Sequence, residues 1–506
     1  MTTPESGPTP LLAMRGITKR FGPVIANDSV DLTLHAGDIL GLLGENGAGK
    51  TTVMNVLFGA YAADEGRIEI HGEAVSIRSS ADALALGIGM VHQHFHLVPS
   101  HTVLENLMVG FPGKGGKLDI KAARARLAEI SSTYGLDLDA DRLVSTLTIG
   151  EQQRLEIIKA LYRGARILIL DEPTAVLTPQ EATSLFDALR AMVADGMAVV
   201  FISHKLHEVR AITNRVMIMR QGQVVASLDD PAAVSEPELA TLMCGHALSP
   251  PVRGSVAVGR ELLRLDRVNT AGPAGLSDVS LSVKGGEIVG IAGVSGNGQA
   301  ALANVIAGML RPTAGQVAVN GAPISRPSPR IMQRHGVGRV PEDRMATGLI
   351  TTLSLSDSMI LPWINRPPFS RFGILRRDHI RRFVNEQIEK FAIRAAGPDA
   401  RTGTLSGGNL QKVLLARELA SDPLVLLAAQ PTRGLDVAAT EFVHKQFLEM
   451  RERQRAVLVI SEDLEELFLL SDRIAVMYEG RIVDTMPIGD ASVEKIGLMM
   501  AGRAAA

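Results

Sequence analysis

The sequence contains a single cysteine, Cys244, among 506 residues. One thiol excludes an internal disulfide and any zinc site that is built from CxxC pairs. A reducing compartment is therefore the expected setting, and Cys244 is predicted to be a small, buried, apolar residue. The chain also lacks an excess of either charge, because its formal net charge is −2 at pH 7. Without a basic excess, we expect no nucleic-acid partner.

Long apolar runs are missing as well. Runs such as 167–170, 198–202 and 424–429 are far shorter than the roughly 20 residues that a membrane-spanning helix needs. The first ten residues, MTTPESGPTP, are polar and contain three prolines, which predicts a disordered tail and no signal peptide. We therefore expect a soluble protein, in which any role at a membrane depends on a partner.

What the sequence does contain is an internal repeat of whole-domain length. The segment 38–49 recurs at 287–298, and the segment 199–204 recurs at 457–462. The offset grows from 249 to 258 residues between these pairs, so the second copy holds about nine extra residues. The segment LPWINRPPFSRFGILRR at 361–377 is the place where we expect them, and its proline and glycine content predicts a loop.

Two similar α/β domains are predicted from the pattern inside each copy. Short apolar runs alternate with helical patterns, which is typical of a mainly parallel sheet flanked by helices. The short segment HALSPPVRGSVAV between the copies suits a linker. The predicted organisation is a tail at 1–10, a first domain at 11–245, a linker at 246–258 and a second domain at 259–506.

A phosphate-binding loop is predicted in the first copy. The apolar strand 39–43 is followed by a G-x4-G-K-[ST] pattern and then by a helical stretch, which is the order that this motif requires. Backbone N–H groups of such a loop converge on phosphate oxygens, and the helix N-terminus favours the anion. Lys50 would reach the β- and γ-phosphates, and Thr51 would offer a hydroxyl to Mg²⁺. The predicted ATP-binding residues here are Gly44, Glu45, Asn46, Gly47, Ala48, Gly49, Lys50, Thr51 and Thr52.

A pair of acidic residues follows a second apolar strand. The strand 167–170 has the form of a Walker B strand and leads directly into Asp171 and Glu172. A carboxylate at such a strand end can hold Mg²⁺, which makes Asp171 a predicted metal ligand together with Thr51. The neighbouring Glu172 can orient or deprotonate the attacking water. ATP and Mg²⁺ are therefore the predicted cofactors.

The order of these motifs resembles the ATP-binding cassette family. The phosphate loop is followed by VHQHF at 91–95, TIGEQQR at 148–154, ILILDEPTAVLT at 167–178 and FISHK at 201–205. The resemblance covers both copies, over residues 12–500. It implies that each copy is a nucleotide-binding domain with a RecA-like phosphate-loop core, an antiparallel β subdomain and a helical subdomain that carries the signature motif.

The resemblance also assigns roles to single residues. It implies that Gln93 senses Mg²⁺ and the permease, and that His204 is the switch histidine at the γ-phosphate. Phe21 would stack on adenine, although a core aromatic is the alternative for this position. The implied catalytic set is therefore Lys50, Gln93, Glu172 and His204, and the implied Mg²⁺ ligands are Thr51, Gln93 and Asp171.

The second copy has lost the catalytic residue types and has kept the signature. Its counterparts of Lys50 and Thr51 are Gln299 and Ala300, and the acidic pair has become 429–430, Ala-Gln. Glu342 and Glu462 replace the loop glutamine and the switch histidine. The signature shows the reverse pattern, because Ser406, Gly407 and Gly408 are close to the family's LSGGQ, whereas the first copy reads Thr-Ile-Gly-Glu at 148–151. Asp436 likewise stands where the first copy has Thr178.

Cassettes of this family pair head to tail, so that each ATP lies between one phosphate loop and the opposite signature. Applied to this chain, the resemblance places all intact parts in one site, which joins the first copy's loops to Ser406, Gly407, Gly408 and Asp436. The degenerate parts fall into the other site. Neutral drift of the first signature is the alternative explanation.

A single chain with two cassettes and no membrane span resembles the sugar and nucleoside import ATPases. Segments 293–299, 340–344, 428–436 and 460–463 resemble the nucleoside type more than the ribose or galactose type, which retains Asp-Glu in the second copy. The resemblance implies two transmembrane permease subunits, an extracytoplasmic substrate-binding lipoprotein, and a peripheral position on the cytoplasmic face of the inner membrane. The segments 96–110 and 351–363 are the expected docking surfaces.

Two other classes stay open at this point. Soluble tandem cassettes that act on ribosomes or nucleic acid are also doubled, but they typically keep both sites intact and carry a long charged linker. A regulatory scaffold that does not hydrolyse ATP would not need Glu172 and His204. Co-purification with a multi-span membrane protein separates the importer from these alternatives.

Overall fold

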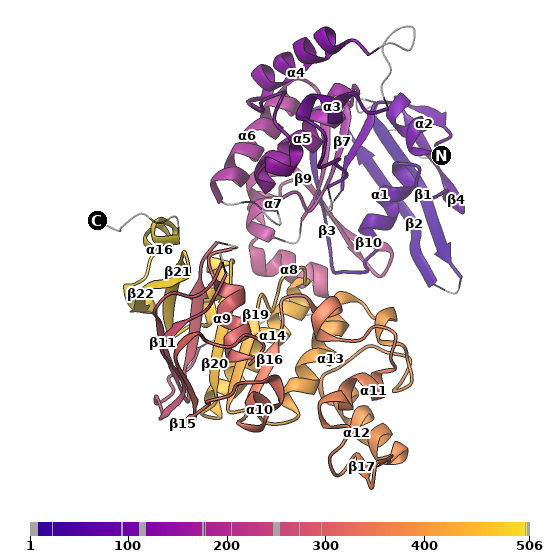
Figure 1. Cartoon of the computed structure of the whole chain (residues 1–506). Coiled ribbons are helices and arrows are strands. Elements are labelled where there is room, and N and C mark those ends of the chain that lie inside the picture. Colours follow the sequence, from indigo (N-terminus) through magenta and orange to yellow (C-terminus); the bar gives the residue numbers. More distant parts are fainter. Residues whose placement is uncertain are drawn as a thin grey trace. The chain divides into compact units, whose positions relative to one another are not determined.

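The computed structural model describes residues 9–22, 24–92, 95–110, 118–174, 177, 179–203, 205–245, 253–272, 274–294, 296–500 and 502. The chain forms two compact units, Met1–Leu248 and Ser249–Ala506. Figure 1 labels the helices and strands of both units. In the part of the chain that the structure describes, no helix combines the length and the apolar character needed to cross a bilayer.

The first unit is built on a six-stranded sheet with the order β10-β9-β3-β8-β7-β6. All neighbouring strands are parallel except β10 and β9, which are antiparallel. All residues of β3, β7 and β8 are buried, as expected for parallel strands that are covered on both faces. The strands are β3 Ile39–Gly44, β6 Ile88–Val91, β7 Ile167–Asp171, β8 Ala198–Ile202, β9 Arg215–Arg220 and β10 Gln223–Leu228.

A second, antiparallel sheet has the order β2-β1-β4-β5. Its strands are β1 Leu12–Phe21, β2 Val24–Leu34, β4 Glu65–Ile70 and β5 Glu73–Val75. Its apolar side chains share one core with the helix α1 (Lys50–Leu57) and with strands of the parallel sheet. This core fixes the position of α1, the helix that begins at the predicted phosphate loop.

Three helices of the first unit form a group of their own, in which α3, α4 and α5 contact one another. Figure 1 shows this group beside the parallel sheet. The helices of the unit are α1, α2 Ser80–Ala85, α3 Val103–Met108, α4 Ile120–Tyr134, α5 Ile149–Tyr162, α6 Pro179–Ala194, α7 Leu206–Ile212 and α8 Glu236–Cys244. Cys244 ends α8 and is partly exposed, so the prediction of a buried cysteine is wrong. It lies at the surface end of the helix, where Met243 and not Cys244 faces the core.

The second unit repeats this architecture. Its larger sheet has the order β16-β19-β20-β13-β21-β22 and its antiparallel sheet the order β12-β11-β14-β15. The strands are β11 Glu261–Asn269, β12 Val279–Lys284, β13 Ile288–Ala292, β14 Ala314–Val319, β15 Ala322–Pro323, β16 Val337–Val340, β19 Val425–Ala429, β20 Ala456–Ser461, β21 Arg473–Tyr478 and β22 Arg481–Pro487. The helices are α9 Gln299–Ile306, α10 Pro329–Arg334, α11 Leu355–Ile360, α12 Arg377–Lys390, α13 Gly407–Leu419, α14 Val437–Glu452, α15 Leu464–Leu470 and α16 Val493–Met500. The predicted fold class, two tandem α/β domains with an antiparallel sheet and a helical group in each, is confirmed.

The segment 361–377 is more ordered than the predicted loop. It contains a 3-10 turn at Leu361–Trp363, then the two antiparallel strands β17 (Ser370–Arg371) and β18 (Ile374–Leu375), and it leads into α12. Trp363 and Phe369 are buried and stacked, with ring centroids 6.1 Å apart. The loop prediction is wrong here because proline and glycine content signals turns but does not register aromatic packing at the ends of a hairpin.

Candidate functional site

The predicted phosphate loop connects the end of β3 to the start of α1 and is tightly packed. Gly49 is the N-cap of α1 with φ 102°, a backbone region that glycine adopts readily. A Cβ atom on Gly49 would lie 2.4 Å from the carbonyl oxygen of Ala26, and one on Gly44 would lie 2.3 Å from that of Met219. The buried Asn27 amide also donates to the carbonyl oxygen of Gly49 (3.1 Å). The loop is therefore held in one shape by its surroundings.

Lys50 is the first residue of α1, and its ammonium group folds back over the loop. Nζ donates to the carbonyl oxygens of Gly44 (2.7 Å) and Glu45 (3.0 Å). Thr51 is exposed in the first turn of the helix. A positive side chain and a helix N-terminus thus coincide at the same loop, and both favour an anion such as a phosphate group.

The acidic pair stands at the same edge of the sheet. Asp171 ends β7, and the strands β3 and β7 both lie parallel beside β8, so their carboxyl ends meet. Asp171 is buried, and burial, with the neighbouring Glu172 adding to it and Lys50 opposing it, raises its pKa to about 6. This open edge is where ligands bind in α/β sheets of this kind.

Mg²⁺ fits these residues. Two carboxylates side by side, one of them buried with a raised pKa, form an oxygen donor set that a hard divalent cation stabilises. Among the described residues, no cluster of three or more His, Cys, Asp and Glu side chains suits a metal. A site with one or two protein oxygens plus phosphate oxygens is the arrangement that Mg²⁺ commonly takes with nucleotides.

Glu172 has an uncommon backbone conformation. Its φ is 51°, in the left-handed region that non-glycine residues rarely adopt, and its N–H donates to the carbonyl oxygen of Ile202 on β8 (2.9 Å). Such strain is often found where a side chain must be aimed at a ligand. The counterpart Gln430 has φ 46° and donates to Ile460 (2.7 Å), so the second unit keeps the backbone and has lost the carboxylate.

Other predicted residues lie outside this core. Gln93, Thr178 and His204 lie outside the residues that the structure describes. Phe21 ends β1 and is 44% exposed, with its ring edge against Tyr61 at a centroid distance of 5.3 Å. The core-aromatic alternative for Phe21 is therefore wrong, and an exposed ring is open to stacking.

Glu208, a buried carboxylate on α7, was not predicted from the sequence. Its two oxygens join two loops at the edge of the sheet. Oε2 accepts from the hydroxyl groups of Thr174, in the loop after β7, and of Ser203 (3.2 Å), directly after β8. Oε1 pairs with Lys205 Nζ (3.2 Å). Because Ser203 and Lys205 flank position 204 in the chain, Glu208 connects the segment of the acidic pair to the segment of the predicted switch histidine.

A signal for Glu208 was present in the repeat. The segment 204–208 reads HKLHE and its counterpart 462–466 reads EDLEE, so the last glutamate is kept while position 204 changes. The counterpart Glu466 accepts from Thr432 (2.8 Å) and contacts His444 on α14 (3.1 Å). Within the described residues its Oε2 has no hydrogen-bond partner. The bridge to the switch segment is thus a feature of the first unit.

The second unit's loop has the same backbone as the first but a different chemistry. Gly298 caps α9 with φ 102°, as Gly49 caps α1. Gln299 stands at the lysine position, and its amide donates to the carbonyl oxygen of Val294 (3.0 Å). Glu342, at the loop-glutamine position, is paired with Arg433 (2.6 Å). The neutral amide of Gln299 and the carboxylate of Glu342, which is paired with Arg433, therefore provide no positive charge that attracts phosphate.

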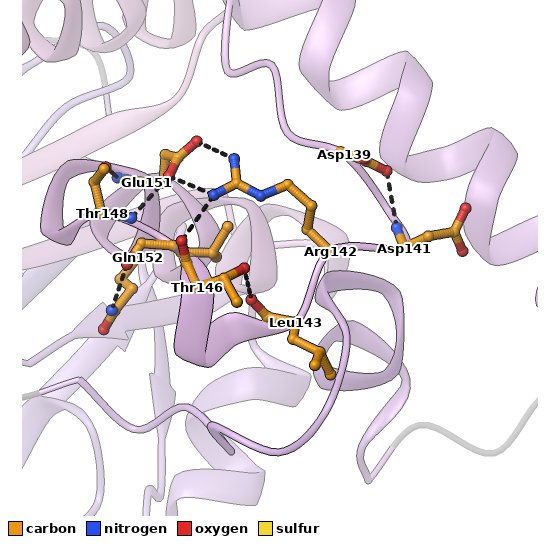
Figure 2. Close-up of polar contacts among 9 residues, drawn as sticks. Asp139, Asp141, Arg142, Leu143, Thr146, Thr148, Glu151 and Gln152 are labelled. Carbon is orange, nitrogen blue, oxygen red and sulfur yellow. Dashed lines mark hydrogen bonds and ion pairs between the residues drawn. The ribbon is translucent and has the colours of Figure 1, made fainter.

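The two signature segments differ in how their helices begin. Figure 2 shows that Thr148 caps α5 in a reciprocal capping box with Glu151, and that Arg142 holds the Glu151 carboxylate with two hydrogen bonds (2.6 and 3.2 Å). Burial acts to raise the pKa of Glu151, but the bonds from Arg142 and Thr148 lower it overall. Ser406 caps α13 without a bond to the helix backbone, and its Oγ accepts from the Asn409 amide (2.9 Å).

Comparison with known proteins gives a consistent result. The family model described as ABC transporter matches residues 27–175 and 276–433. The nucleoside import ATP-binding protein NupA of Lactococcus lactis is 40% identical over 97% of this chain and 98% of its own length. The guanosine import ATP-binding protein NupO of Bacillus subtilis is 42% identical, over 97% of each chain. The glucose import ATP-binding protein TsgD13 of Haloferax volcanii is 42% identical, over 97% of this chain and 96% of its own.

The family model covers more than half of the chain in two separate matches, and these matches fall in the two units that repeat one fold. The named relatives match along nearly the whole length of both chains. The chain therefore belongs to the ABC transporter family, with two ATP-binding cassettes in tandem.

Proposed function

We propose that this chain is the ATP-hydrolysing subunit of an importer and that it drives separate permease subunits. The observation that carries the proposal is the convergence of Lys50, Asp171 and Glu172 at one edge of the first unit's sheet. The names of the relatives support import as the process. The solute is proposed to be a nucleoside, because two of these relatives carry nucleoside or guanosine import in their names and the second cassette lacks the acidic pair.

In this proposal the first unit holds ATP and Mg²⁺. The loop 44–52 would wrap the phosphates and Lys50 would offset their charge. Thr51, Gln93 and Asp171 would hold the metal, whose charge would stabilise the transferred phosphoryl group. Phe21 stacks on adenine. Glu172 orients the water for in-line attack on the γ-phosphate, and His204 contacts that phosphate.

We further propose that one composite site does the work. The phosphate loop of the first unit would face Ser406, Gly407 and Gly408, with Asp436 beside them. The exposed N-cap residue Ser406, whose side chain makes no bond to the backbone of α13, supports this, because the N-terminal N–H groups of the helix stay available to a γ-phosphate. Thr148 and Glu151, in contrast, already satisfy each other and place a negative charge where phosphate would come.

ATP binding would close the pair because the γ-phosphate bonds to both units in the closed state alone. Hydrolysis removes that bridge, and the units part. Two permease subunits would convert this cycle into alternating access, with a substrate-binding lipoprotein delivering the solute from outside the cytoplasmic membrane. The chain would sit on the cytoplasmic face of that membrane.

A cavity in the second unit supports the proposed docking surface at 351–363. Its volume is about 410 Å³, and Leu361 and Pro362 form part of its wall together with Met309, Arg339 and Glu418. Burial lowers the pKa of the Arg339 guanidinium, and Glu418 opposes this. A groove whose walls combine apolar and charged side chains is suited to receive a short amphipathic helix of a permease loop.

Co-purification tests the importer proposal. The chain is expected to co-purify in detergent with its two proposed permease subunits, because docking on 96–110 and 351–363 does not need a bilayer. The measurement is the subunit ratio after size-exclusion chromatography, with one tandem chain expected for two permeases. A chain that leaves the permeases and sediments with ribosomes instead would contradict the importer proposal.

Glu208→Gln tests the positioning role of the buried carboxylate. The amide keeps the shape but loses the charge that pairs with Lys205 and can no longer accept at both oxygens, so the switch segment is expected to shift. We expect the kcat for ATP hydrolysis to fall about 10- to 100-fold, with little change in the KM for ATP.

Glu466→Gln in the second unit is the matched control for this change. It is equally buried and also bonds a threonine, but it does not bridge to a switch segment. Glu466→Gln is expected to lower Tm by about as much as Glu208→Gln does, while its kcat stays within about twofold of wild type. Equal losses of kcat in both variants would show that the carboxylate has a purely structural role.

A further inference from the structure

The hairpin β17–β18 in the second unit exposes two apolar side chains at its tip. Phe372 is 90% exposed and Ile374 is 73% exposed, the two largest values among the exposed large apolar residues of the described chain. Figure 1 shows β17 at the periphery of the second unit, beyond α12. A scattered exposed leucine needs no explanation, but two neighbouring side chains of this size at a protruding turn suggest a contact.

The backbone at the tip gives a second reason. Phe372 and Gly373 have φ values of 51° and 80°, which is the conformation of a two-residue hairpin turn that normally carries Asn-Gly. A bulky aromatic residue is strained there, and its exposed ring recovers little by packing within the unit. An interaction outside the unit would explain why an exposed phenylalanine stands at this strained turn position.

The base of the hairpin is rigid. Phe369 stacks on Trp363 and meets Phe383 of α12 edge-on, with ring centroids 5.0 Å apart for the latter pair. Trp363 and Phe369 are buried, and Trp363 is the single tryptophan of the chain. The tip is thus presented on a fixed aromatic support.

Positive charge surrounds the tip. The segment 366–382 contains six arginines and one aspartate, although the whole chain has a formal net charge of −2. Arg377 and Arg381 pair with Asp357 (2.6 Å) and Asp399 (2.7 Å). The exposed Arg371 and Arg376 flank the tip and form no ion pair within the described residues, and the Arg371 guanidinium lies 5.3 Å from the centroid of the Phe372 ring.

We propose that this hairpin binds the surface of an anionic lipid bilayer. Phe372 and Ile374 enter the boundary between headgroups and acyl chains, and Arg371 and Arg376 contact the headgroup phosphates. Aromatic and aliphatic side chains next to basic residues are the combination that binds such interfaces. The proposal deepens the proposed function by naming a second membrane contact beside the permeases.

A lipid surface fits this hairpin better than a protein does. A stable protein interface buries about 800 Å² on each partner with matching shape, and two protruding side chains offer a fraction of that area. A bilayer imposes no such match of shape, and it attracts basic residues through its surface potential. The charge and the small apolar tip therefore favour lipid as the occupant.

Vesicle binding by the full chain, without permeases or ATP, tests the proposal. We expect sedimentation with vesicles that contain 30% phosphatidylglycerol and much weaker sedimentation with pure phosphatidylcholine. Phe372→Asn with Ile374→Thr is expected to lower the affinity about tenfold or more while keeping the turn, because Asn-Gly suits this backbone and threonine suits a strand. Arg371→Gln with Arg376→Gln is expected to lower it about 25-fold, at roughly fivefold for each charge.

Controls separate this proposal from the proposed function. Val483→Ser with Val493→Ser removes two exposed apolar residues elsewhere in the same unit and is expected to leave vesicle binding unchanged. The hairpin variants are expected to keep wild-type ATPase activity in solution. Vesicle binding by the hairpin variants equal to that of wild type, or no binding of wild type to anionic vesicles, would overturn the proposal. Binding to permease-containing vesicles alone would assign the hairpin to a protein partner and would overturn it as well.

Discussion

Glu172→Gln is expected to stop ATP turnover while ATP stays bound. The amide preserves the shape of the side chain and its strained backbone with φ 51°, but it cannot orient and deprotonate water as a carboxylate does. Removing such a group typically costs about 10²–10⁴ in rate. The measurement is the steady-state release of phosphate together with the ATP that remains bound after gel filtration, and one ATP per chain is expected.

The mirrored change in the second unit serves as the control. Gln430→Glu restores a carboxylate on a backbone of the same conformation, but Gln299, Ala300 and Ala429 still leave phosphate and metal unsupported. We therefore expect no gain of activity in the Glu172→Gln background. Two tightly held ATP molecules per chain, or activity recovered through Gln430→Glu, would show that the second unit's phosphate loop also works.

The strands that lead into the predicted loops were located correctly from the sequence because each pattern is local. The strand 39–43 corresponds to β3, and the acidic pair follows β7 as expected, because each motif is a strand followed by a fixed turn. Comparison of the two copies also located the losses at Gln299 and Gln430. Their backbone was not predictable, yet the structure shows that Gly298 and Gln430 keep the conformations of Gly49 and Glu172.

Features that depend on distant contacts were missed. Glu208 has a neighbour 34 residues away in Thr174, and no pattern along the chain gives that pairing. The exposure of Cys244 was not predictable because it depends on which elements cover the end of α8. The hairpin at 370–375 was missed because its turn carries Phe-Gly where Asn-Gly would have signalled it.

The structure indicates which change in the first signature can serve as a control for the second. A Cβ atom on Gly150 would lie 2.1 Å from a carboxylate oxygen of Glu181. Aspartate at position 150 would therefore meet a like charge within its own unit, and its effect would not report on phosphate. Thr148→Ala is the better match to Ser406→Ala, because both residues cap the signature helix. The cost of Thr148→Ala is expected to be about 1 kcal/mol of stability from the lost cap.

Gly408→Asp is expected to abolish ATP hydrolysis almost completely. Position 408 is buried in the first turn of α13, and a Cβ atom there would lie 3.2 Å from the Cβ of Ala439. In the composite site that we propose, a carboxylate at this position would meet the γ-phosphate bound to the first unit's loop. Ser406→Ala removes one donor and is expected to cost about 10²–10³ in rate. Because Ser406→Ala leaves the helix backbone intact, it reports on activity even if Gly408→Asp unfolds the second unit.

The most direct test of a single composite site compares kcat for Ser406→Ala and Thr148→Ala under identical conditions. The two changes remove the hydroxyl group of the N-cap residue of each signature helix, which makes no bond to the backbone of α13 at Ser406 and accepts from the backbone of α5 at Thr148. We predict a loss of about 10²-fold or more for Ser406→Ala and a kcat within about twofold of wild type for Thr148→Ala, with Tm confirming that both variants fold. Equal losses of kcat in the two variants would contradict the division of the chain into one working site and one silent site.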